Sequence, residues 1–316
     1  MKREECYDIL KDCLLKYIDN DYILLDLPYF SNVGDILIWQ SAKDLLKEVP
    51  YKCIYSASIE TYKKKEIPYK AIVIFMGGGN WGDLWIRHQK FRQRVLKDYP
   101  YNKIVQLPQS AYWKDTDAMA FDSKLFSNHR APIILMAREK KTFYLFQEEY
   151  TFAKSVLVPD LVLSFNVQNY CKKHRIKIIE GKGKLLVQRC DAEKNMYQPK
   201  LSGENFAEIS DWPCMKNALL EDKVYNVIMK FVSFTMPQAI MLKLKDFFFK
   251  NILIHSYIRS GINYLNMFES IYSTRLHAGV LAWLLGKQTF IIDNSYGKCS
   301  GVYDEWVSDQ KKLNML

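Results

Sequence analysis

The C-terminal half of the chain contains the sequences STRLHAG at residues 273–279 and FIIDNSYGK at residues 290–298, separated by an apolar, helix-like stretch. We expect one strand to end at Arg275, a helix to begin near His277, and a second strand to end just before Lys298. Ligands bind at the carboxyl ends of the strands in α/β sheets. The three ionisable side chains are therefore expected to gather at such an edge.

The chemistry of this expected edge suits an anion. Arg275 carries a planar fork of N–H donors that matches phosphate or carboxylate, and Lys298 carries a compact positive charge. His277 titrates near neutrality, and the free N–H groups of a helix N-terminus attract negative charge. The pattern predicts a site that binds an anion and moves a proton. In the structural alternative, Arg275 pairs with a carboxylate such as Asp293, and His277 only caps the helix.

The composition is that of a folded protein with an excess of positive charge. The 316 residues are 49% hydrophobic and 25% charged, which argues against wholesale disorder and is enough for two domains. The formal charge of +10 favours anionic partners: nucleic acid, acidic lipid headgroups or phosphorylated substrates. Zinc-ligand spacing, an RNA-binding aromatic signature and a dense basic tail are all missing from the sequence. We therefore expect no nucleic-acid partner and no metal.

The cysteines and the first residues indicate the compartment. Seven cysteines are scattered along the chain without a C-x-x-C pair, which is typical of reduced thiols in a cytosolic protein. The first ten residues include acidic side chains where a signal peptide would be apolar. No uncharged apolar run approaches the roughly 18 residues that cross a membrane. We expect a cytoplasmic protein.

Residues 1–170 are expected to form a parallel sheet with helices on both faces. Apolar strands at residues 22–27, 71–76, 103–107, 133–137 and 156–158 alternate with helix-like segments. Asp35 stands near the start of the first of these helices, and the glycine-rich sequence GGGNWGD follows the second strand at residues 77–83. Successive glycines admit a ligand close to the backbone, although the same turn also serves tight packing. Arg138 stands just beyond another strand, where a surface ion pair is the alternative role.

A polar and basic stretch at residues 166–184 marks a boundary between an N-terminal domain, residues 1–170, and a C-terminal domain, residues 171–316. In the second domain, we expect a strand at 185–188, followed by a charged segment at 189–194. Residues 224–231 and 237–264 are expected to be helical. The longer helix interleaves apolar residues with Lys243, Lys245, Lys250 and Arg259. Such a helix usually covers a sheet, and contact with an anionic membrane surface is the alternative.

Six short motifs occur together in an order that resembles the polysaccharide pyruvyltransferase family. They are Asn32-x-Gly34-Asp35, Gly77-Gly78-Gly79-Asn80-x-Gly82-Asp83, Pro108-Gln109-Ser110, Pro159-Asp160, Arg275-Leu276-His277 and Asp293-Asn294-x-x-Gly297-Lys298. Each motif alone is common, but the ordered set spans residues 32–298. The resemblance implies an α/β fold of two Rossmann-like domains that face each other across a cleft, similar to GT-B glycosyltransferases, with no dinucleotide.

The resemblance also implies an activity. Members of the family move the enolpyruvyl unit of phosphoenolpyruvate onto a sugar, commonly closing a cyclic ketal, during assembly of exopolysaccharide, capsule or cell-wall polymers. It implies that Arg275 and His277 bind the donor through the family's R-x-H motif and that Arg138 is the second arginine. We add Lys298 because of its position at a strand end. No cofactor is expected besides phosphoenolpyruvate as co-substrate.

These expectations assign roles to the remaining motif residues. His277 would protonate the methylene carbon of the donor, and Asp35 or Asp83 would be the base, unless each only caps its helix. The acceptor sugar would meet the N-terminal half through five residues: Asn32, Gly78, Gly79, Asn80 and Trp81. The resemblance further implies an acceptor carried on undecaprenyl diphosphate. The charge of +10 and the basic helix would then hold the enzyme at the inner face of the membrane.

Two other functions remain open from the sequence. In a nucleotide-sugar glycosyltransferase of similar architecture, Arg275, His277 and Lys298 would grip a diphosphate. In a non-catalytic carbohydrate- or anion-binding scaffold, the same residues and the glycine turns would be purely structural.

Overall fold

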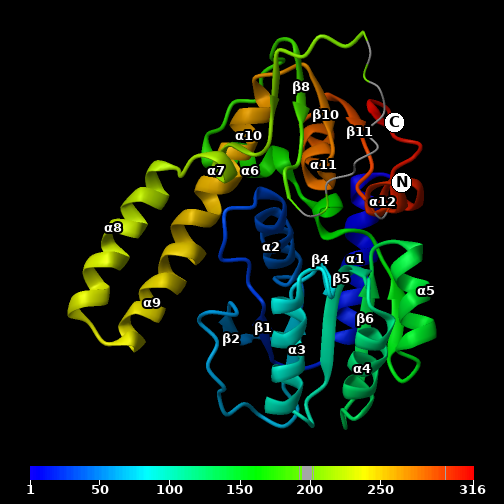
Figure 1. The fold of residues 1–316 in the computed structure, drawn as a ribbon, viewed down its shortest axis with the longest axis vertical. Helices are drawn as coiled ribbons and strands as arrows, with labels where there is room; N and C mark the ends of the chain where they lie inside the picture. Colours follow the sequence, from blue (N-terminus) through cyan, green and yellow to red (C-terminus); the bar gives the residue numbers. More distant parts are fainter. Residues whose placement is uncertain (192, 194–200, 202, 296) are drawn as a thin grey trace. The chain divides into compact units, whose positions relative to one another are not determined.

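The strands form two sheets in which every pairing is parallel (Figure 1). The structure is a computed structural model that describes residues 1–191, 193, 201, 203–295 and 297–316. The chain divides into two compact units. Residues 1–27, 38–164 and 301–307 form unit 1, and residues 28–37, 165–300 and 308–316 form unit 2. In the charged segment at 189–194, Ala192 and Lys194 lie outside the described residues. The same holds for Tyr296 in the motif at residues 293–298.

Unit 1 contains a seven-stranded sheet with the order β2-β1-β3-β5-β6-β7, and β4 pairs with the far end of β5. Its strands are β1 (Tyr22–Leu25), β2 (Cys53–Ala57), β3 (Ile72–Phe75), β4 (Gly78–Gly82), β5 (Ile104–Tyr112), β6 (Ile133–Ala137) and β7 (Lys154–Leu157). The five strands expected from apolar runs are all present. The strand β2 is partly exposed and the strand β4 is glycine-rich, so neither stands out as an apolar run.

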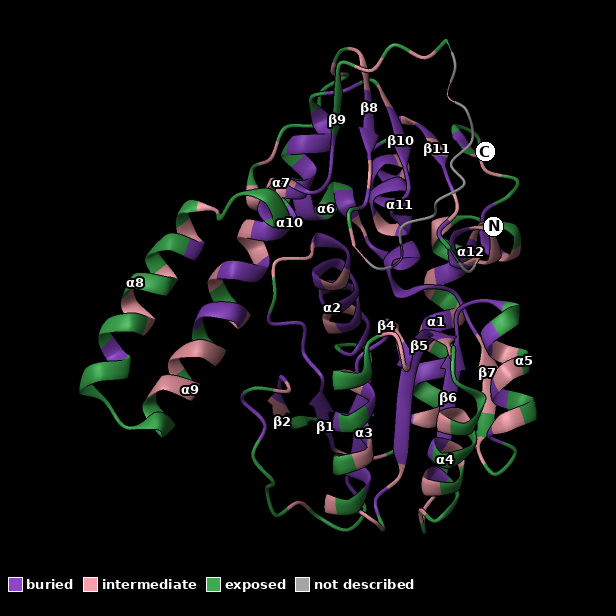
Figure 2. Ribbon diagram, viewed as in Figure 1, coloured by how far each residue is buried: buried purple, intermediate pink, exposed green. Residues whose placement is uncertain are grey.

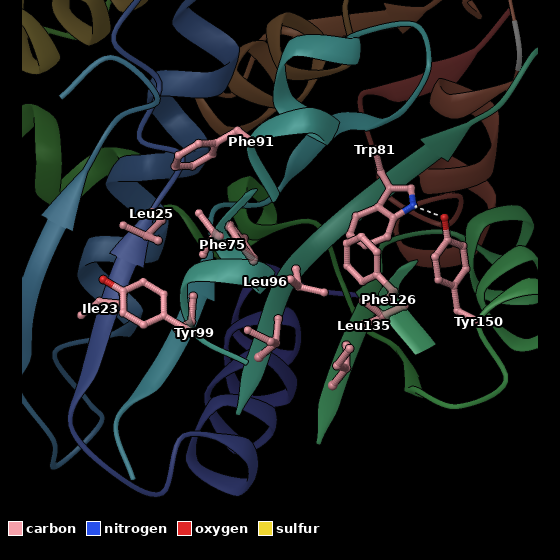
Figure 3. Close-up of a cluster of buried hydrophobic side chains, with 14 of the residues drawn as sticks. Ile23, Leu25, Phe75, Trp81, Phe91, Leu96, Tyr99, Phe126, Leu135 and Tyr150 are labelled. Carbon is pink, nitrogen blue, oxygen red and sulfur yellow. Dashed lines mark hydrogen bonds between the residues drawn. The ribbon is translucent and has the colours of Figure 1, made fainter. Parts of the chain in front are cut away.

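Helices cover both faces of this sheet. They are α1 (Arg3–Tyr17), α3 (Ile86–Asp98), α4 (Thr116–Ser127) and α5 (Lys140–Glu149), with a short 3₁₀ turn η1 (Leu161–Ser164). Phe91 of α3 and Phe126 of α4 pack with Phe75 and Leu135 in one buried cluster (Figure 3). Neighbouring strand residues point to opposite faces, and Met136 contacts Cys13 of α1 at 4.0 Å between the sulfurs. The helix α1 therefore covers the opposite face.

Unit 2 contains a five-stranded sheet with the order β12-β11-β10-β8-β9. Its strands are β8 (Lys184–Val187), β9 (Glu208–Ser210), β10 (Ser270–Ser273), β11 (Gln288–Ile291) and β12 (Leu313–Met315). The strand β12 lies almost at the C-terminus and pairs with β11 at the edge of the sheet. The mixed α/β class with parallel sheets is thus confirmed in both units.

The helices of unit 2 are α6 (Val167–His174), α7 (Pro213–Lys216), α8 (Leu220–Thr235), α9 (Gln238–Phe248), α10 (Ile254–Asn266) and α11 (Leu276–Leu284). A π-helical segment, η2 (Phe249–Leu253), joins α9 to α10, so the expected helix at 237–264 is one continuous helical run. The helices α8 and α9 form a hairpin that extends away from the sheet of unit 2 (Figure 1). Two helices are divided between the units: α2 (Val33–Leu45) and α12 (Lys298–Trp306).

Three further properties bear on the expectations. All seven cysteines are free thiols. Among the described residues, none of the helices combines the length and the apolar character needed to cross a bilayer. The glycine-rich segment at 77–83 is not a loop after β3, because its central residues form the strand β4.

Candidate functional site

The carboxyl edge of the unit 2 sheet has the expected strand-to-helix arrangement around Arg275 and His277. The expectation for Lys298 was wrong, because β11 (Gln288–Ile291) ends at Ile291 and Lys298 is the first residue of α12. The strand β10 ends at Ser273, Arg275 precedes the first residue of α11, and His277 lies in the first turn of that helix. Arg275 is buried, with an exposed fraction of 6%, and His277 is half-buried. The edge therefore presents a guanidinium and an imidazole beside a helix N-terminus.

Carboxylates hold the fork of Arg275. Its Nε donates to Oδ1 of Asp211 at 2.5 Å and its Nη2 donates to Oδ2 of the same residue at 2.7 Å. Nη2 also contacts Oδ2 of Asp191 at 3.0 Å. Burial alone would lower the pKa of Arg275, but the hydrogen bonds and charges of the two aspartates raise it above the ordinary value. Arg275 is a permanent, oriented cation, and its partner is not Asp293.

The contacts continue from Arg275 to Lys298. Asp191 accepts from Nε of Arg189 at 2.8 Å, and Nη1 of Arg189 donates to Oε2 of Glu193 at 2.7 Å. The same Oε2 accepts from Nζ of Lys298. Three cations thus alternate with three carboxylates along one chain of ion pairs, which we call the unit 2 ion-pair chain: Asp211, Arg275, Asp191, Arg189, Glu193 and Lys298.

The pKa of Glu193 shows how strongly the charges in the unit 2 ion-pair chain interact. Burial would raise the pKa of its carboxyl, but the charges of Lys298 and Arg189 outweigh burial and hold the pKa far below the ordinary value. The sequence predicted cations that bind an anion and left open that Arg275 pairs with a carboxylate; the structure shows Arg275 and Lys298 balanced by Asp211 and Glu193. The physical reason is that a buried charge is costly unless it is paired.

His277 lies against the first motif of the chain. A Cβ atom placed on Gly34 would lie 2.8 Å from Nδ1 of His277 and 3.2 Å from its Cβ. Asn32 accepts from the backbone N–H of Gly34 at 3.0 Å and donates through Nδ2 to Asp35 at 2.7 Å. Asn32 therefore caps the start of α2. The N-x-G-D and R-L-H motifs, far apart in sequence, form one cluster within unit 2.

The last motif caps α12. Oδ1 of Asp293 accepts from the backbone N–H of Cys299 at 3.0 Å and of Ser300 at 3.3 Å, and Oδ1 of Asn294 accepts from that of Lys298 at 2.8 Å. These contacts fix the start of the helix that carries Lys298. They also explain why Asp293 does not serve as the partner of Arg275.

Arg138 joins two other motifs within unit 1. Its Nη1 donates to Oδ2 of Asp160 at 2.6 Å and its Nε donates to Oγ of Ser110 at 2.8 Å. Arg138 is 1% exposed and Asp160 is equally buried. The alternative of a surface ion pair is wrong, because both charges lie below the surface. The motifs at 108–110 and 159–160 thus meet around one arginine.

The glycine motif packs against the neighbouring strand. A Cβ on Gly77 would lie 2.4 Å from the carbonyl oxygen of Pro108, and one on Gly82 would lie 1.9 Å from that of Tyr112. Gly78 and Gly79 belong to β4, and Gly78 is paired with Gln109 of β5. These glycines therefore allow two backbones to approach each other.

Asn80, Trp81 and Asp83 each have partners within unit 1. Oδ1 of Asn80 accepts from Nε2 of Gln109 at 2.8 Å. Trp81 is 2% exposed and donates from Nε1 to the hydroxyl of Tyr150 at 3.2 Å inside the aromatic cluster (Figure 3). Both carboxylate oxygens of Asp83 accept from the backbone N–H groups of residues 114 and 115. In this arrangement Trp81 is a core residue and Asp83 fixes a loop.

One polar cluster was not anticipated. Nδ1 of His88 contacts Oδ1 of Asp26 at 2.8 Å, and Asp26 also accepts from Nη2 of the fully buried Arg92 at 3.2 Å. Asp26 follows β1 directly and has a positive φ of 66°. An acidic residue directly after a buried strand was the available sequence signal.

The candidate residues divide between the two units. Asn32, Asp35, Arg275, His277 and Lys298 belong to unit 2, whereas Gly78, Gly79, Asn80, Trp81, Asp83 and Arg138 belong to unit 1. Within the described part of the chain, the structure shows no group of three His, Cys, Asp or Glu side chains that could hold a metal ion.

Comparison with known proteins places the chain in a family. A family model described as polysaccharide pyruvyl transferase matches residues 32–296. The chain is 28% identical over 305 residues to the Bacillus subtilis (strain 168) protein named "Putative pyruvyl transferase EpsO", covering 94% of this chain and 88% of that protein. It is 23% identical to "Pyruvyl transferase 1" of Schizosaccharomyces pombe, over 90% of this chain and 69% of the relative.

A solved structure shows the same fold. The crystal structure of a functionally uncharacterised protein from Klebsiella pneumoniae matches with a TM-score of 0.62 and 18% identity, and the match covers 100% of this chain and 99% of that one. The matched segment of the family model begins at the Asn32 motif and extends past the R-L-H motif, so it includes both parts of the His277 cluster. The chain therefore belongs to the polysaccharide pyruvyl transferase family, and it is a transferase.

Proposed function

We propose that this transferase moves the enolpyruvyl group of phosphoenolpyruvate to a sugar of a polysaccharide precursor, forms a pyruvate ketal and releases phosphate. The observation that carries the proposal is the cluster of His277 with Gly34 and Asn32 beside Arg275, all within unit 2. It joins a proton donor, an oriented cation and a helix N-terminus, which are the groups that an anionic enol ether requires.

Arg275 binds the donor through Nη1, the guanidinium nitrogen that the carboxylates do not use. Nε and Nη2 are used by Asp211 and Asp191, and Nη1 makes no hydrogen bond within the described residues. The two N–H groups of Nη1 suit a carboxylate or phosphate oxygen. The first N–H groups of α11, which a helix leaves without internal partners, supply further donors. Asp211 and Asp191 orient the guanidinium for this contact.

The reaction proceeds by proton transfer to carbon. His277 donates a proton to the methylene carbon of the donor, which leaves an oxocarbenium-like centre at the carbon that bears the phosphate ester. A sugar hydroxyl attacks that carbon and gives its proton to a base. Phosphate then leaves with the electrons of its C–O bond, and a neighbouring hydroxyl attacks the same carbon and gives its proton to the neutral imidazole of His277, which closes the ketal. General acid–base help of this kind contributes about 10² to 10⁴ in rate.

Asp35 is the better candidate for the base. It belongs to the same unit as His277 and lies in the first turn of α2, three residues from Asn32. In Asp83, both carboxylate oxygens accept from backbone N–H groups of its own unit.

The other binding roles stay predictions. They are donor binding by Lys298 and Arg138, and acceptor binding by Asn32, Gly78, Gly79 and Asn80. We further propose an acceptor carried on undecaprenyl diphosphate.

The test is an assay with phosphoenolpyruvate and a panel of simple and lipid-linked sugars, read by mass and by phosphate release. The proposal requires phosphate release that depends on the acceptor, with a product that gains one ketal-linked pyruvate.

Variants test the assigned residues. His277→Asn should lower kcat by about 10² or more. Arg275→Lys should mainly raise KM for the donor, because lysine lacks the fork. Arg87→Lys, in an exposed ion pair with Glu60, is the matched control and should behave as wild type. Release of a nucleoside diphosphate from a sugar nucleotide, with no use of phosphoenolpyruvate, would overturn the proposal.

A further inference from the structure

The helix α8 carries an exposed apolar stripe along one side. Its members are Leu220, Val224, Val227, Phe231 and Phe234, and their exposed fractions run from 47% to 80%. They are spaced by four, three, four and three residues, which places all five on one face of a helix. Figure 2 shows that α8 is largely exposed, in contrast to the buried strands of unit 2. We call these five residues the α8 stripe.

The hairpin does not need the α8 stripe for its own packing. The opposite side of α8 faces α9 and η2, where Tyr225 contacts the rings of Phe248 and Phe249 at centroid distances of 5.5 and 5.6 Å. Val232, on the same side, is buried. The helix α8 is therefore apolar on two sides, and only one of them is explained by the hairpin.

The surroundings of the α8 stripe are cationic. Lys223 and Lys230 are exposed and, at about 100° of rotation per residue, both lie along the same edge of the stripe. The segment from Lys223 to Lys245 contains four lysines and no acidic residue. Among the acidic residues next to this segment, Asp222 accepts from the hydroxyl of Tyr257 and Asp246 accepts from that of Tyr29. Glu221, in the first turn of α8, lies on the side of the helix opposite to Lys223 and Lys230.

We infer that the α8 stripe is the surface through which this protein binds an anionic lipid bilayer. A helix that lies in the membrane interface combines an apolar face with lysines along its edges. The apolar side chains enter the boundary between headgroups and acyl chains, while the lysine stems reach outward to the lipid phosphates. A second copy of the chain fits less well, because two such stripes would bring their lysines together. The sequence had suggested the basic residues of the helical run at 237–264, whereas the exposed apolar side chains lie mainly on α8.

The experiment is vesicle co-sedimentation with the full chain, without donor or acceptor, so its outcome is independent of the proposed reaction. Vesicles contain phosphatidylcholine alone or a mixture with phosphatidylglycerol. Wild type should bind the anionic vesicles at least tenfold better than the neutral ones, and added salt should weaken this binding. Phe231→Ser with Phe234→Ser should lower binding at least tenfold. Lys223→Glu with Lys230→Glu should remove the preference for anionic lipid.

Matched controls lie in unit 1. Phe121→Ser with Tyr144→Ser removes two exposed aromatic residues, and Lys63→Glu with Lys64→Glu changes the net charge by the same amount as the stripe variant. Both should bind as wild type does. Unchanged binding by the two stripe variants, with thermal melting showing that they fold, would overturn the inference. So would failure of wild type to bind anionic vesicles, or a dimer in solution that the phenylalanine variants abolish.

Discussion

The imidazole of His277 lies directly over the backbone of Gly34, with Nδ1 only 2.8 Å from where a Cβ atom of residue 34 would lie. A side chain on residue 34 would thus collide with an imidazole from the other end of the chain. Contacts this short are not tolerated, so any larger residue must displace the ring. The position of the imidazole and the absence of a side chain at Gly34 are therefore linked.

Gly34→Ala should reduce activity by moving the ring of His277. With His277 as the proposed general acid, we expect kcat to fall by about tenfold or more, since small misplacement of such a group is costly, with a stability loss of only about 1 kcal/mol. Steady-state kinetics and thermal unfolding check this. The double variant Gly34→Ala with His277→Ala should be no slower than His277→Ala alone, because the glycine acts through the ring. Additive effects of the two substitutions on kcat would show that Gly34 acts in another way.

Asp211→Asn should destabilise unit 2. The substitution removes one carboxylate charge from the bidentate contact with Arg275 and leaves a buried guanidinium incompletely balanced. Loss of one partner of a buried ion pair typically costs about 3–5 kcal/mol. Denaturant unfolding measures this cost. Asp44→Asn, which removes the exposed pair with Lys47, is the control and should cost less than about 1 kcal/mol. Equal costs for the two variants would argue against the unit 2 ion-pair chain.

Stability should fall in acid because of Glu193. Its pKa in the folded protein lies below the ordinary 4.5, since Lys298 and Arg189 outweigh burial. A carboxyl with a lowered folded pKa stabilises the fold above its unfolded pKa, and this contribution is lost as the pH falls from about 4.5 toward the folded value. Melting temperatures between about pH 7 and pH 3 should therefore decline less steeply for Glu193→Gln than for wild type. Parallel curves would contradict this assignment.

Trp81→Phe should affect stability rather than acceptor binding. Trp81 packs edge-on against Phe146 and Tyr150 and donates to the hydroxyl of Tyr150. Loss of that hydrogen bond and of ring volume should cost about 1–3 kcal/mol, with acceptor KM unchanged. The nearby Trp85 is 37% exposed, and Trp85→Phe should stay within about 0.5 kcal/mol of wild type. A raised acceptor KM with normal stability in Trp81→Phe would instead support a stacking role.

The sequence by itself determined the class of fold and the order of the motifs. Apolar runs that end in polar residues predicted five of the seven strands of unit 1, as well as β8, β10 and the start of α11. These features are local, since burial of a strand requires a short apolar run wherever that strand lies. Segments without such a run were missed, namely the exposed β2 and the glycine-rich β4. The cleft expected between two domains stays a prediction.

Only the tertiary structure decided which groups meet. Arg275 pairs with Asp211, which is 64 residues away, and Trp81, assigned to the acceptor from its place in the glycine motif, is buried in an aromatic core. No local pattern encodes these contacts, because a desolvated charge takes its partner from whichever segment the packing brings near. The sequence therefore specified the chemical groups of the site, and long-range packing determined their partners, their burial and their orientation.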